Sequence, residues 1–588
     1  MKIVGGGLVA LATSLATASA FAWPGTLDLT FGNRGKVVTD LGAQEEARAA
    51  VLQPDGRIVV AGESRMSVPA GQFALARYNP DGALDPLFGT GGKVLTTIGT
   101  LAYAGALALQ TDGKLVAAGG ADAAFAIARY DASGILDPGF GSGGIVTTAI
   151  GDFAGATAVA IQPDGKIVAV GDSTTATNAD FALARYDTSG NLDPTFGTGG
   201  VVITDLGGYD HAHAAALQPD GRIIVGGFFS PSLTSTDTSF ALARYATDGS
   251  LDSSFGTAGT VVTGFPGQIA ALALLAGGKL LAAGKASPAG FALARYNSDG
   301  STDATFGTGG MVTSRFGNGA GSYPDAASAL VIQSDGRIVA AGSAQPGYST
   351  SLFGVMRYEA DGALDQTFAP CAAVTTPFPP VGPLGARATA VLVQPDGKLV
   401  AVGTTDYDFA LTRYVGSGGA SACTPAASGK ANLKLRSATA TYHPHITWGW
   451  TGADPVVGDF GDPTAGTDLT LCVLDGSGAN RLAGTTPADP CSTGGSCWRA
   501  TANAYRYAVA GRLAGCLNGF SRARLRVRAV GTATIRTQGG VCGFGVPSPP
   551  LALPVVVRLQ RDDGPNCWEA TFSHPSENDL RQFTARSD

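Results

Sequence analysis

Histidine, cysteine and carboxylate side chains carry most nucleophilic, acid–base and metal chemistry, and few of them stand here in a pattern that such chemistry needs. The chain of 588 residues contains only five His. No Ser-His-Asp order, HExxH pair or phosphate-binding Gly loop is recognisable in it. His211 and His213, in YDHAHAAALQ, would share one face of a strand beside Asp210, and such a set could hold a metal ion. The motif occurs once and lacks a full ligand set, so we favour a solvent-facing start of a strand and expect no cofactor or metal.

Arginine and aspartate recur at regular intervals, and this is the second pattern that could carry chemistry. The arginines precede a tyrosine at Arg77, Arg129, Arg185, Arg244, Arg295, Arg357 and Arg413. The aspartates follow a leucine or threonine at Asp28, Asp85, Asp137, Asp193, Asp252, Asp303 and Asp365. One interpretation is a ring of seven binding sites. We favour an Arg–Asp pair or turn cap in every repeat, because a group present in each repeat is explained by what each repeat needs.

The segments around these residues repeat as well, and they must position them. Stretches such as FALARYNPDGALDPLFGTGGKV alternate with AVAIQPDGKIVAVG, and the seven arginines span 336 residues at a mean interval of 56. Each repeat holds four strand-like pieces joined by Gly-rich turns, and helical spacing is absent. Four strands per repeat, seven times over, predict a seven-bladed β-propeller. The abundant Ala and Gly fit blades packed face to face.

The two ends of the repeat array predict how the ring closes. GTLDLTFGNRGKVVTD, from Gly25, is a fourth-strand module that precedes the first complete repeat, and the seventh repeat ends at Tyr414 without one. We therefore expect residues 27–40 to complete the blade that contains 386–414. Such closure removes the exposed edges of an open array.

The repeats resemble the delta-60 repeat of bacterial exported proteins, over about residues 25–416. The resemblance rests on QPDGKIVAVG, FALARY and LDPTFGTGG. It implies a propeller-like array and no established enzymatic activity. The strand layout is also similar to that of kelch propellers.

The N-terminus and the composition indicate an exported protein. Residues 1–22 read as a secretory signal peptide, with one Lys, an apolar run and small residues before the cleavage site. No later stretch is apolar for long enough to span a bilayer. The net charge of −7 lacks the basic field of a nucleic-acid-binding protein. We expect a monomer that is secreted, extracellular or periplasmic.

Beyond the repeats, a linker over 417–430 leads to a second predicted domain over 431–588, where alternating strands predict a β-sandwich-like fold. Eight cysteines predict disulfides in an exported chain. We expect Cys371 to pair with Cys423, which would hold the linker against the propeller. The later six would pair among themselves: Cys472, Cys491, Cys497, Cys516, Cys542 and Cys567. The predicted fold is thus all-β, with the propeller (23–416) followed by a disulfide-stapled domain.

In that domain, SRARLRVRAV places Arg522, Arg524, Arg526 and Arg528 on one face of a strand, about 7 Å apart. We expect this face to be exposed, because burying unpaired charges is costly. The favoured interpretation is a solvated face that cross-strand carboxylates compensate, and the alternative is that these four arginines form a polyanion-binding strip. Trp448 and Trp450 could stack on sugars, although core packing is the favoured interpretation.

Two functions remain open from the sequence. The favoured one is a non-enzymatic scaffold that binds a protein or an anionic glycan outside the cell. The alternative is a propeller enzyme, such as a polysaccharide lyase or hydrolase, with its active site at the central channel.

Overall fold

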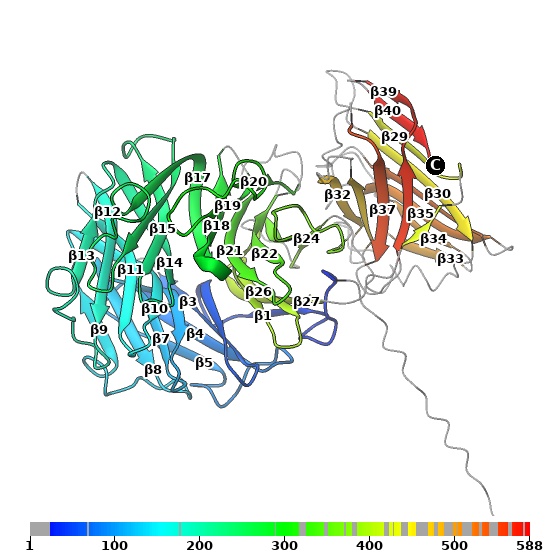
Figure 1. The fold of residues 1–588 in the computed structure, drawn as a ribbon. Helices are drawn as coiled ribbons and strands as arrows, with labels where there is room; N and C mark the ends of the chain where they lie inside the picture. The colour runs from blue at the N-terminus through cyan, green and yellow to red at the C-terminus, as the bar shows by residue number, and fades with distance from the viewer. Residues whose placement is uncertain are drawn as a thin grey trace, which may run out of the picture.

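The structure is a computed structural model in which a ring of small sheets and a separate pair of sheets follow one another along the chain (Figure 1). It describes residues 24–588 except 68–69, 176–177, 288–289, 317–324, 346–350, 370–371, 379–384, 417–422, 427–428, 437–444, 454–468, 475–479, 487–497, 502–503, 509–519, 529–531, 540–550, 562–566 and 580–581. The predicted signal peptide therefore lies outside the described residues. No helix in the described ranges is long and apolar enough to cross a membrane.

Each repeat forms a blade of four antiparallel strands. Blade 1 holds β2 (Gln44–Leu52), β3 (Ile58–Ser67), β4 (Ala70–Tyr78) and β5 (Lys93–Thr96); blade 2 holds β6 (Ala102–Leu109), β7 (Leu115–Ala121), β8 (Ala124–Tyr130) and β9 (Ile145–Thr148); blade 3 holds β10 (Phe153–Ile161), β11 (Ile167–Thr174), β12 (Ala179–Tyr186) and β13 (Val201–Thr204).

Blades 4 and 5 share one long strand. Blade 4 holds β14 (Tyr209–Leu217), β15 (Ile223–Ser230), β16 (Ser239–Tyr245) and the first part of β17 (Thr260–Leu274); blade 5 holds the rest of β17, then β18 (Leu280–Ala286), β19 (Phe291–Tyr296) and β20 (Met311–Ser314). A short 3-10 helix, Ala276–Gly278, stands where the other blades have the turn PDG, TDG or SDG. Blade 6 holds β21 (Ala326–Ile332), β22 (Ile338–Ala344), β23 (Leu352–Tyr358) and β24 (Ala373–Thr376).

The seventh blade joins the two ends of the array. Its own strands are β25 (Ala386–Val393), β26 (Leu399–Thr405) and β27 (Asp408–Tyr414), and its fourth strand is β1 (Lys36–Thr39). In this pair Lys36 lies opposite Thr412 and Thr39 opposite Phe409. The predicted closure by the N-terminal strand is confirmed. Paired in this way, β27 presents no free hydrogen-bonding edge.

The first strand of each blade is the innermost, because β2, β6, β10, β14, β17, β21 and β25 contact one another around the ring. Each contains a β-bulge, such as the register shift between Ala156 and Ala158 in β10. The bulge brings the inner strand very close to the second strand, where a glycine lies. A Cβ added to Gly171 would lie 2.0 Å from the carbonyl oxygen of Gly155. Close approach of this kind is the reason for the glycine in the repeated VAVG motif.

Apolar side chains fill the space between neighbouring blades. The cluster between blades 7 and 1 combines Phe31, Val60 and Tyr78 with Val402 and Leu411, all fully buried. Equivalent clusters lie between the other blades. Each blade therefore buries its faces only against its neighbours, and the ring is stable as a closed unit.

The C-terminal part is a β-sandwich-like pair of sheets. One sheet has the order β28 (Thr424–Pro425), β38 (Cys567–Phe572), β37 (Val555–Arg561), β31 (Leu469–Leu474) and β32 (Asn480–Thr486). The other has the order β33 (Trp498–Thr501), β34 (Ala504–Ala508), β35 (Phe520–Arg528), β36 (Thr532–Gly539), β30 (His445–Ala453), β29 (Asn432–Arg436), β40 (Gln582–Arg586) and β39 (Pro575–Asn578).

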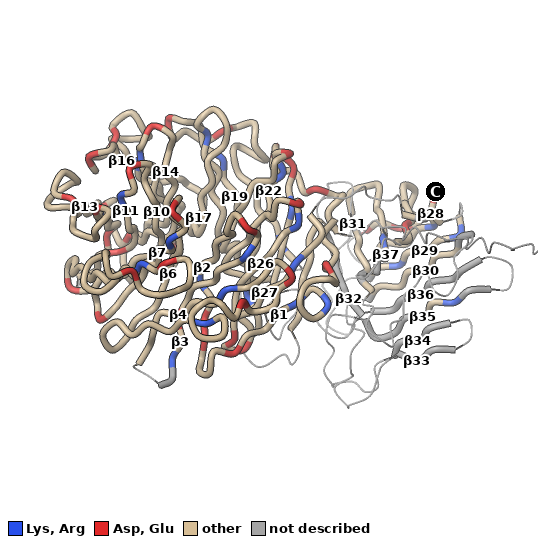
Figure 2. The backbone as a smooth tube through the Cα atoms, turned by 90° about the horizontal axis from the view of Figure 1, so that it is seen from below, with Lys and Arg blue, Asp and Glu red and all other residues tan. Residues whose placement is uncertain are grey.

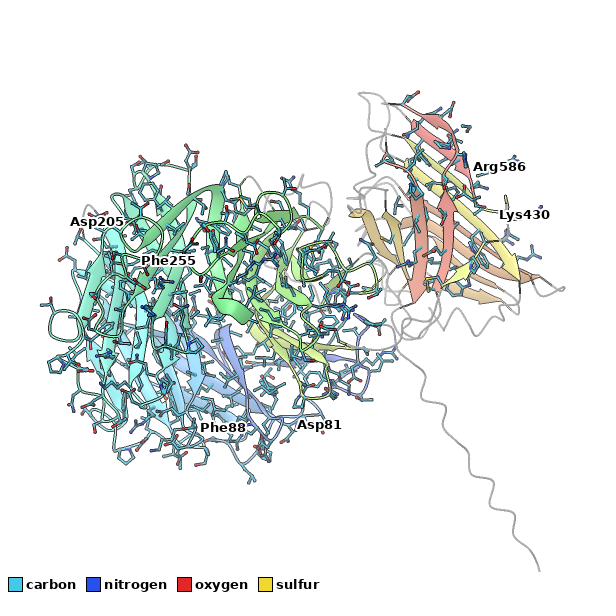
Figure 3. The ribbon with its side chains drawn as sticks, in the orientation of Figure 1. Asp81, Phe88, Asp205, Phe255, Lys430 and Arg586 are labelled. Atoms are coloured by element: carbon cyan, nitrogen blue, oxygen red, sulfur yellow. A yellow bond between two sulfur atoms is a disulfide. The ribbon has the colours of Figure 1, made fainter. Side chains whose placement is uncertain are left out.

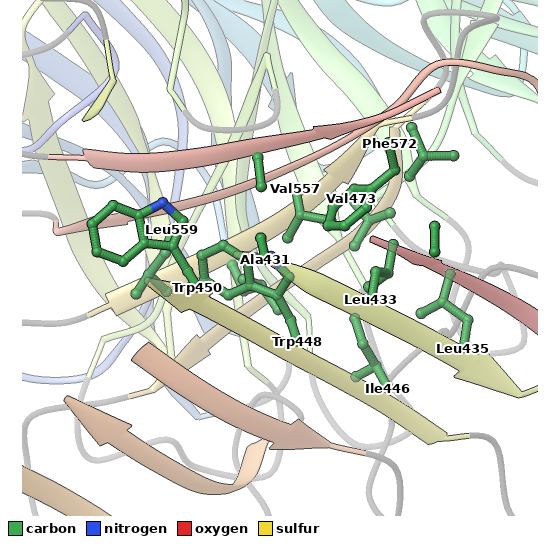
Figure 4. Close-up of a cluster of buried hydrophobic side chains, with 14 of the residues drawn as sticks. Ala431, Leu433, Leu435, Ile446, Trp448, Trp450, Val473, Val557, Leu559 and Phe572 are labelled. Atoms are coloured by element: carbon green, nitrogen blue, oxygen red, sulfur yellow. The ribbon is translucent and has the colours of Figure 1, made fainter. Parts of the chain in front are cut away.

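One apolar core holds these two sheets together (Figure 4). Trp448 and Trp450 from β30 are fully buried in it, and Trp450 Nε1 donates to the carbonyl oxygen of Glu569 at 3.2 Å. Leu471 and Val557 face them from the other sheet. Both tryptophans are thus core residues and do not form a sugar-stacking surface.

Candidate functional site

The repeated arginine and aspartate form a clasp that links each blade to the next. In blade 1 the Nε of Arg77 donates to Oδ2 of Asp85 at 2.8 Å, and the guanidinium lies 4.6 Å from the ring centroid of Phe88. Nη1 of Arg77 also donates to the carbonyl oxygen of Ala132, in the turn of blade 2. Arg77 and Asp85 are both buried. A paired, hydrogen-bonded arginine over an aromatic ring is a stable arrangement for a buried cation.

The same clasp occurs in all seven blades, and Figure 3 labels two of its phenyl rings, Phe88 and Phe255. The pairs are Arg77–Asp85, Arg129–Asp137, Arg185–Asp193, Arg244–Asp252, Arg295–Asp303, Arg357–Asp365 and Arg413–Asp28. In blade 3 an open cavity of about 500 Å³ borders Arg185 and Lys166. Both cations already pair with Asp193, so the geometry assigns them to the structure of the ring.

The clasp of blade 7 joins residues from opposite ends of the propeller. Nε of Arg413 donates to Oδ2 of Asp28 at 2.8 Å, and Lys398 lies 3.1 Å from the same oxygen. Burial alone would raise the pKa of Asp28. Hydrogen bonds from Thr30 and the charges of Lys398 and Arg413 outweigh burial and lower this pKa to about 2. Arg413 also donates to the carbonyl oxygen of Pro80 in blade 1. The closing blade therefore has the full clasp.

Near the central axis, by contrast, the side chains differ from blade to blade. Arg48 of β2 lies 3.0 Å from Glu63 and 3.2 Å from Glu46, and its guanidinium lies 5.1 Å from the ring centroid of Tyr103. Arg387 of blade 7 pairs with the other oxygen of Glu46. These contacts connect blades 7, 1 and 2 beside the axis.

Two histidines extend this polar region into blade 4. Nδ1 of His211 lies 2.8 Å from Oδ2 of Asp172, whose Oδ1 accepts the backbone N–H of Ala212 at 2.7 Å. Burial would lower the pKa of His211, but the hydrogen bond and the charge of Asp172 outweigh it and raise this pKa. Nδ1 of His213 lies 3.0 Å from the carbonyl oxygen of Ile269, and burial lowers the pKa of His213.

The structure does not bring the three residues considered as a possible metal site together. The side chains of His211 and His213 are half-buried, and both rings pack against the ring of Phe228. The expectation of a solvent-facing pair is therefore wrong. Asp210 does not pair with them and lies near Asp180 and Asp205 instead. Around the axis, both oxygens of Glu46, Glu63 and Asp172 accept a hydrogen bond or ion pair. Each of these carboxylate oxygens already takes part in a contact within the ring.

The arginine strip lies on β35, in the larger C-terminal sheet. Arg524 and Arg526 are exposed, and Leu525 between them is fully buried. Strand register extends the strip sideways, since Arg506 and Arg536 lie directly opposite Arg524 on its two sides. The row continues through Gly449 and Asn432 to Arg586, which is exposed and labelled in Figure 3. Directly paired residues point to the same face of a sheet, about 5 Å apart.

Seven adjacent strands of this sheet contain no acidic residue, and six of them, all except β30, carry Lys or Arg that strand register places on that face. The strands are β33, β34, β35, β36, β30, β29 and β40. Their basic residues are Arg499, Arg506, Arg522, Arg524, Arg526, Arg528, Arg536, Lys434, Arg436 and Arg586, and we call this set the basic face. Glu577 of the edge strand β39 is the acidic residue that register places beside it. Within the described strands β34, β35 and β36, the register places no acidic residue opposite the strip. On the propeller, acidic and basic residues are interspersed (Figure 2).

The disulfide prediction for Cys371 and Cys423 is wrong. Cys423 pairs with Cys567, with a Cα–Cα distance of 4.8 Å. The reason lies in β28, which follows Cys423 and pairs parallel to β38, so that Thr424 lies opposite Trp568. The linker is therefore held on the C-terminal sandwich, and Cys567 does not pair within the later group. Cys472 is also disulfide-bonded. Cys371, Cys491, Cys497, Cys516 and Cys542 lie outside the described residues.

The fold and its clasps define a closed seven-bladed β-propeller followed by a β-sandwich-like domain. By sequence, the chain is similar to the family described as a β-propeller domain of unknown function, DUF5122. The match falls in seven segments: 53–88, 110–140, 162–196, 218–255, 277–306, 333–368 and 394–416. A search of the curated proteins gives no significant match.

Solved structures similar to the chain include virginiamycin B lyase from Staphylococcus aureus, with 11% identity, a TM-score of 0.39, and coverage of 64% of this chain and 98% of that one. Sqt1 from Chaetomium thermophilum has 14% identity, a TM-score of 0.36, and coverage of 64% and 98%. Drosophila Plexin A, in complex with Semaphorin 1b, has 10% identity, a TM-score of 0.33, and coverage of 67% and 88%. We draw no functional conclusion from likenesses this distant.

Sequence reasoning singled out His211 but missed the other axial residues, such as Arg48 and Tyr103, and the sideways extension of the arginine strip. Tyr103 and His211 stand at equivalent positions of their repeats, one residue before the alanine at the bulge. The signal that could have found them is a departure from the repeat at a position near the axis. For the basic face, the signal was the absence of Asp and Glu from seven strand segments.

Proposed function

We propose that this is an exported binding protein whose basic face holds an anionic polymer, such as an acidic polysaccharide. The propeller serves as a rigid scaffold. The observation that carries the proposal is the row of basic residues across neighbouring strands, with Arg506, Arg524 and Arg536 in direct register. Like charges side by side repel one another, and a bound polyanion relieves that repulsion.

The arrangement suits a polymer because its charges extend in two directions. Along β35 the arginines are spaced about 7 Å apart, and across the sheet about 5 Å apart. Arginine binds carboxylate and sulfate-like groups through two parallel N–H donors, which favours it over lysine for this task. The Cys423–Cys567 disulfide supports export, since disulfides persist in oxidising compartments.

The test is retention on immobilised heparin or another acidic polysaccharide at low salt. We expect the wild-type protein to be retained and to elute as salt rises, because salt screens surface charge. The double variant Arg524→Ser/Arg526→Ser should elute at clearly lower salt, and changing all four arginines of the strip should abolish retention. A propeller variant, Arg34→Ser/Arg315→Ser, has the same change in net charge and should elute like the wild type. Equal elution of all variants would refute the proposal.

One observation favours the alternative, an enzyme with its active site at the axis. His211 is bonded through Nδ1 to Asp172, which orients the imidazole as in many general bases. Under this alternative, His211→Gln would abolish turnover of a polysaccharide substrate and leave retention on the acidic polymer unchanged. If no acidic polysaccharide is shortened by the wild-type protein, the binding function stands alone.

A further inference from the structure

Two junctions between blades each bring three carboxylates together. At the junction of blades 3 and 4 these are Asp180, Asp205 and Asp210, and one ligand oxygen of each lies within 4.8 Å of the others. Asp205 follows strand β13, Asp210 lies in β14 and Asp180 in β12. We call this set the acidic trio. Figure 3 labels Asp205 on the propeller.

One oxygen of the acidic trio is buried without a partner. Asp210 is fully buried, and its Oδ2 accepts the backbone N–H of Leu206 at 2.7 Å, but Oδ1 has no hydrogen-bond partner. An unpaired buried carboxylate oxygen is costly. The negative charges of Asp180 and Asp205 nearby increase this cost. Burial, together with the charges of Asp205 and Asp180, raises the pKa of Asp210 to about 6.

The junction of blades 7 and 1 repeats this arrangement at equivalent positions. Asp40 follows β1, Glu45 lies in β2, and Asp408 begins β27, again with ligand oxygens within 4.8 Å of one another. Glu45 is 1% exposed, and its Oε2 has no hydrogen-bond partner. We call this set the second trio. It combines residues from the two ends of the propeller.

A third junction shows how the backbone alone can satisfy a buried acid at the position of Asp210. Between blades 5 and 6, Asp325 takes the position of Asp210. Its Oδ2 accepts the N–H of Phe316 at 2.8 Å and its Oδ1 the N–H of Gln345 at 2.6 Å, so both oxygens are paired. Arg315 stands where the first trio has Asp205. A buried acid here can thus be satisfied by the backbone, and the other two acids are not needed for folding.

From these observations we propose that each trio binds one divalent cation, with calcium as the best match. Calcium takes six to eight oxygen ligands at about 2.3–2.6 Å, so two oxygens on one ion lie at most about 5 Å apart. Three carboxylates within 4.8 Å meet that limit, and the exposed side of Asp205 leaves room for water ligands. The cation would pair with the free oxygen of Asp210 and offset three like charges.

The cation would also act as a fastener between blades. Asp180 and Asp205 belong to blade 3, and Asp210 to blade 4. In the second trio, Asp40 precedes the first complete blade and Asp408 belongs to the last, so an ion there would reinforce the closure of the ring.

The test is the number of calcium ions bound by the full chain after treatment with EDTA, measured by equilibrium dialysis with radioactive calcium. Because other parts of the chain can contribute, the change between variants decides. Asp205→Asn and Asp40→Asn should each lose one ion per chain, and the double variant two. Asp152→Asn, an exposed acid at the junction of blades 2 and 3, should lose none.

Thermal unfolding gives a second readout. Calcium should raise the melting temperature of the propeller, and the double variant should show no rise. Asp205 and Asp40 are both exposed, so these substitutions should leave the fold intact. The proposal is overturned if Asp205→Asn and Asp40→Asn bind as many ions as the wild type, or if Asp152→Asn loses as many as they do.

Discussion

Replacing Asp28 by Asn tests whether the clasp of blade 7 keeps the ring closed. Asp28 is 7% exposed. Its Oδ2 accepts a hydrogen bond from Nε of Arg413 and forms an ion pair with Nζ of Lys398. The decrease of its pKa from 3.8 to about 2 corresponds to about 2 kcal/mol in favour of the charged form. Asn removes the charge, so we expect the strand β1 to open more easily by a similar free energy. This is roughly a 30-fold faster exchange of its backbone amides.

The assay is hydrogen exchange of residues 36–39 and 409–412, followed by mass spectrometry. Asp193→Asn is a matched control, because Asp193 lies 2.9 Å from Arg185 and 3.0 Å from Lys166 and bonds Thr195, as Asp28 bonds Thr30. Its clasp links blade 3 to blade 4, far from the closing blade in the chain order of the ring, so exchange at β1 and β27 should stay at the wild-type level. Unchanged exchange at β1 in Asp28→Asn, or equal acceleration in both variants, would refute the reasoning.

Three further predictions concern the same aspartate, the glycine beside the β-bulge and the linker disulfide. First, because the pKa of Asp28 is lowered in the folded protein, the charged carboxylate stabilises the fold fully above about pH 4, and this stabilisation is lost as the pH falls toward 2. The melting temperatures of the wild type and Asp28→Asn should therefore converge on acidification, and a constant difference would contradict this. Second, Gly171→Ala should lower the free energy of unfolding of the propeller in urea by about 2–4 kcal/mol, since its Cβ would meet the oxygen of Gly155 at 2.0 Å. The control Gly264→Ala, with open space around the added methyl group, should lower it by less than about 1 kcal/mol. Third, Cys423→Ser should release the linker and lower the free energy of unfolding of the C-terminal domain by about 2–5 kcal/mol, because the disulfide closes a loop of 144 residues. If limited proteolysis near residue 423 is no faster than in the wild type, β28 holds the linker without the disulfide.

The repeat architecture could be predicted because each part of it is local in the sequence. Alternation in FALARY predicts a strand, PDG predicts its hairpin turn, and the seven copies count the blades. The closing strand was predictable for the same reason, since the first fragment of a repeat is the piece that the last repeat lacks. Four arginines at every second position of one strand likewise share a face, whatever surrounds them.

Only the tertiary structure decided which distant residues meet. Cys423 and Cys567 are 144 residues apart, and their pairing depends on β28 adding to a sheet that the sequence does not reveal. Arg506 and Arg536 join the strip through strand register, which a shift of one residue would reverse. The second trio combines Asp40 with Asp408 across the closed ring. Strand patterns depend on neighbouring residues and can be read along the chain, whereas pairing, register and charge clusters depend on how separate segments pack, and that is determined only in the folded protein.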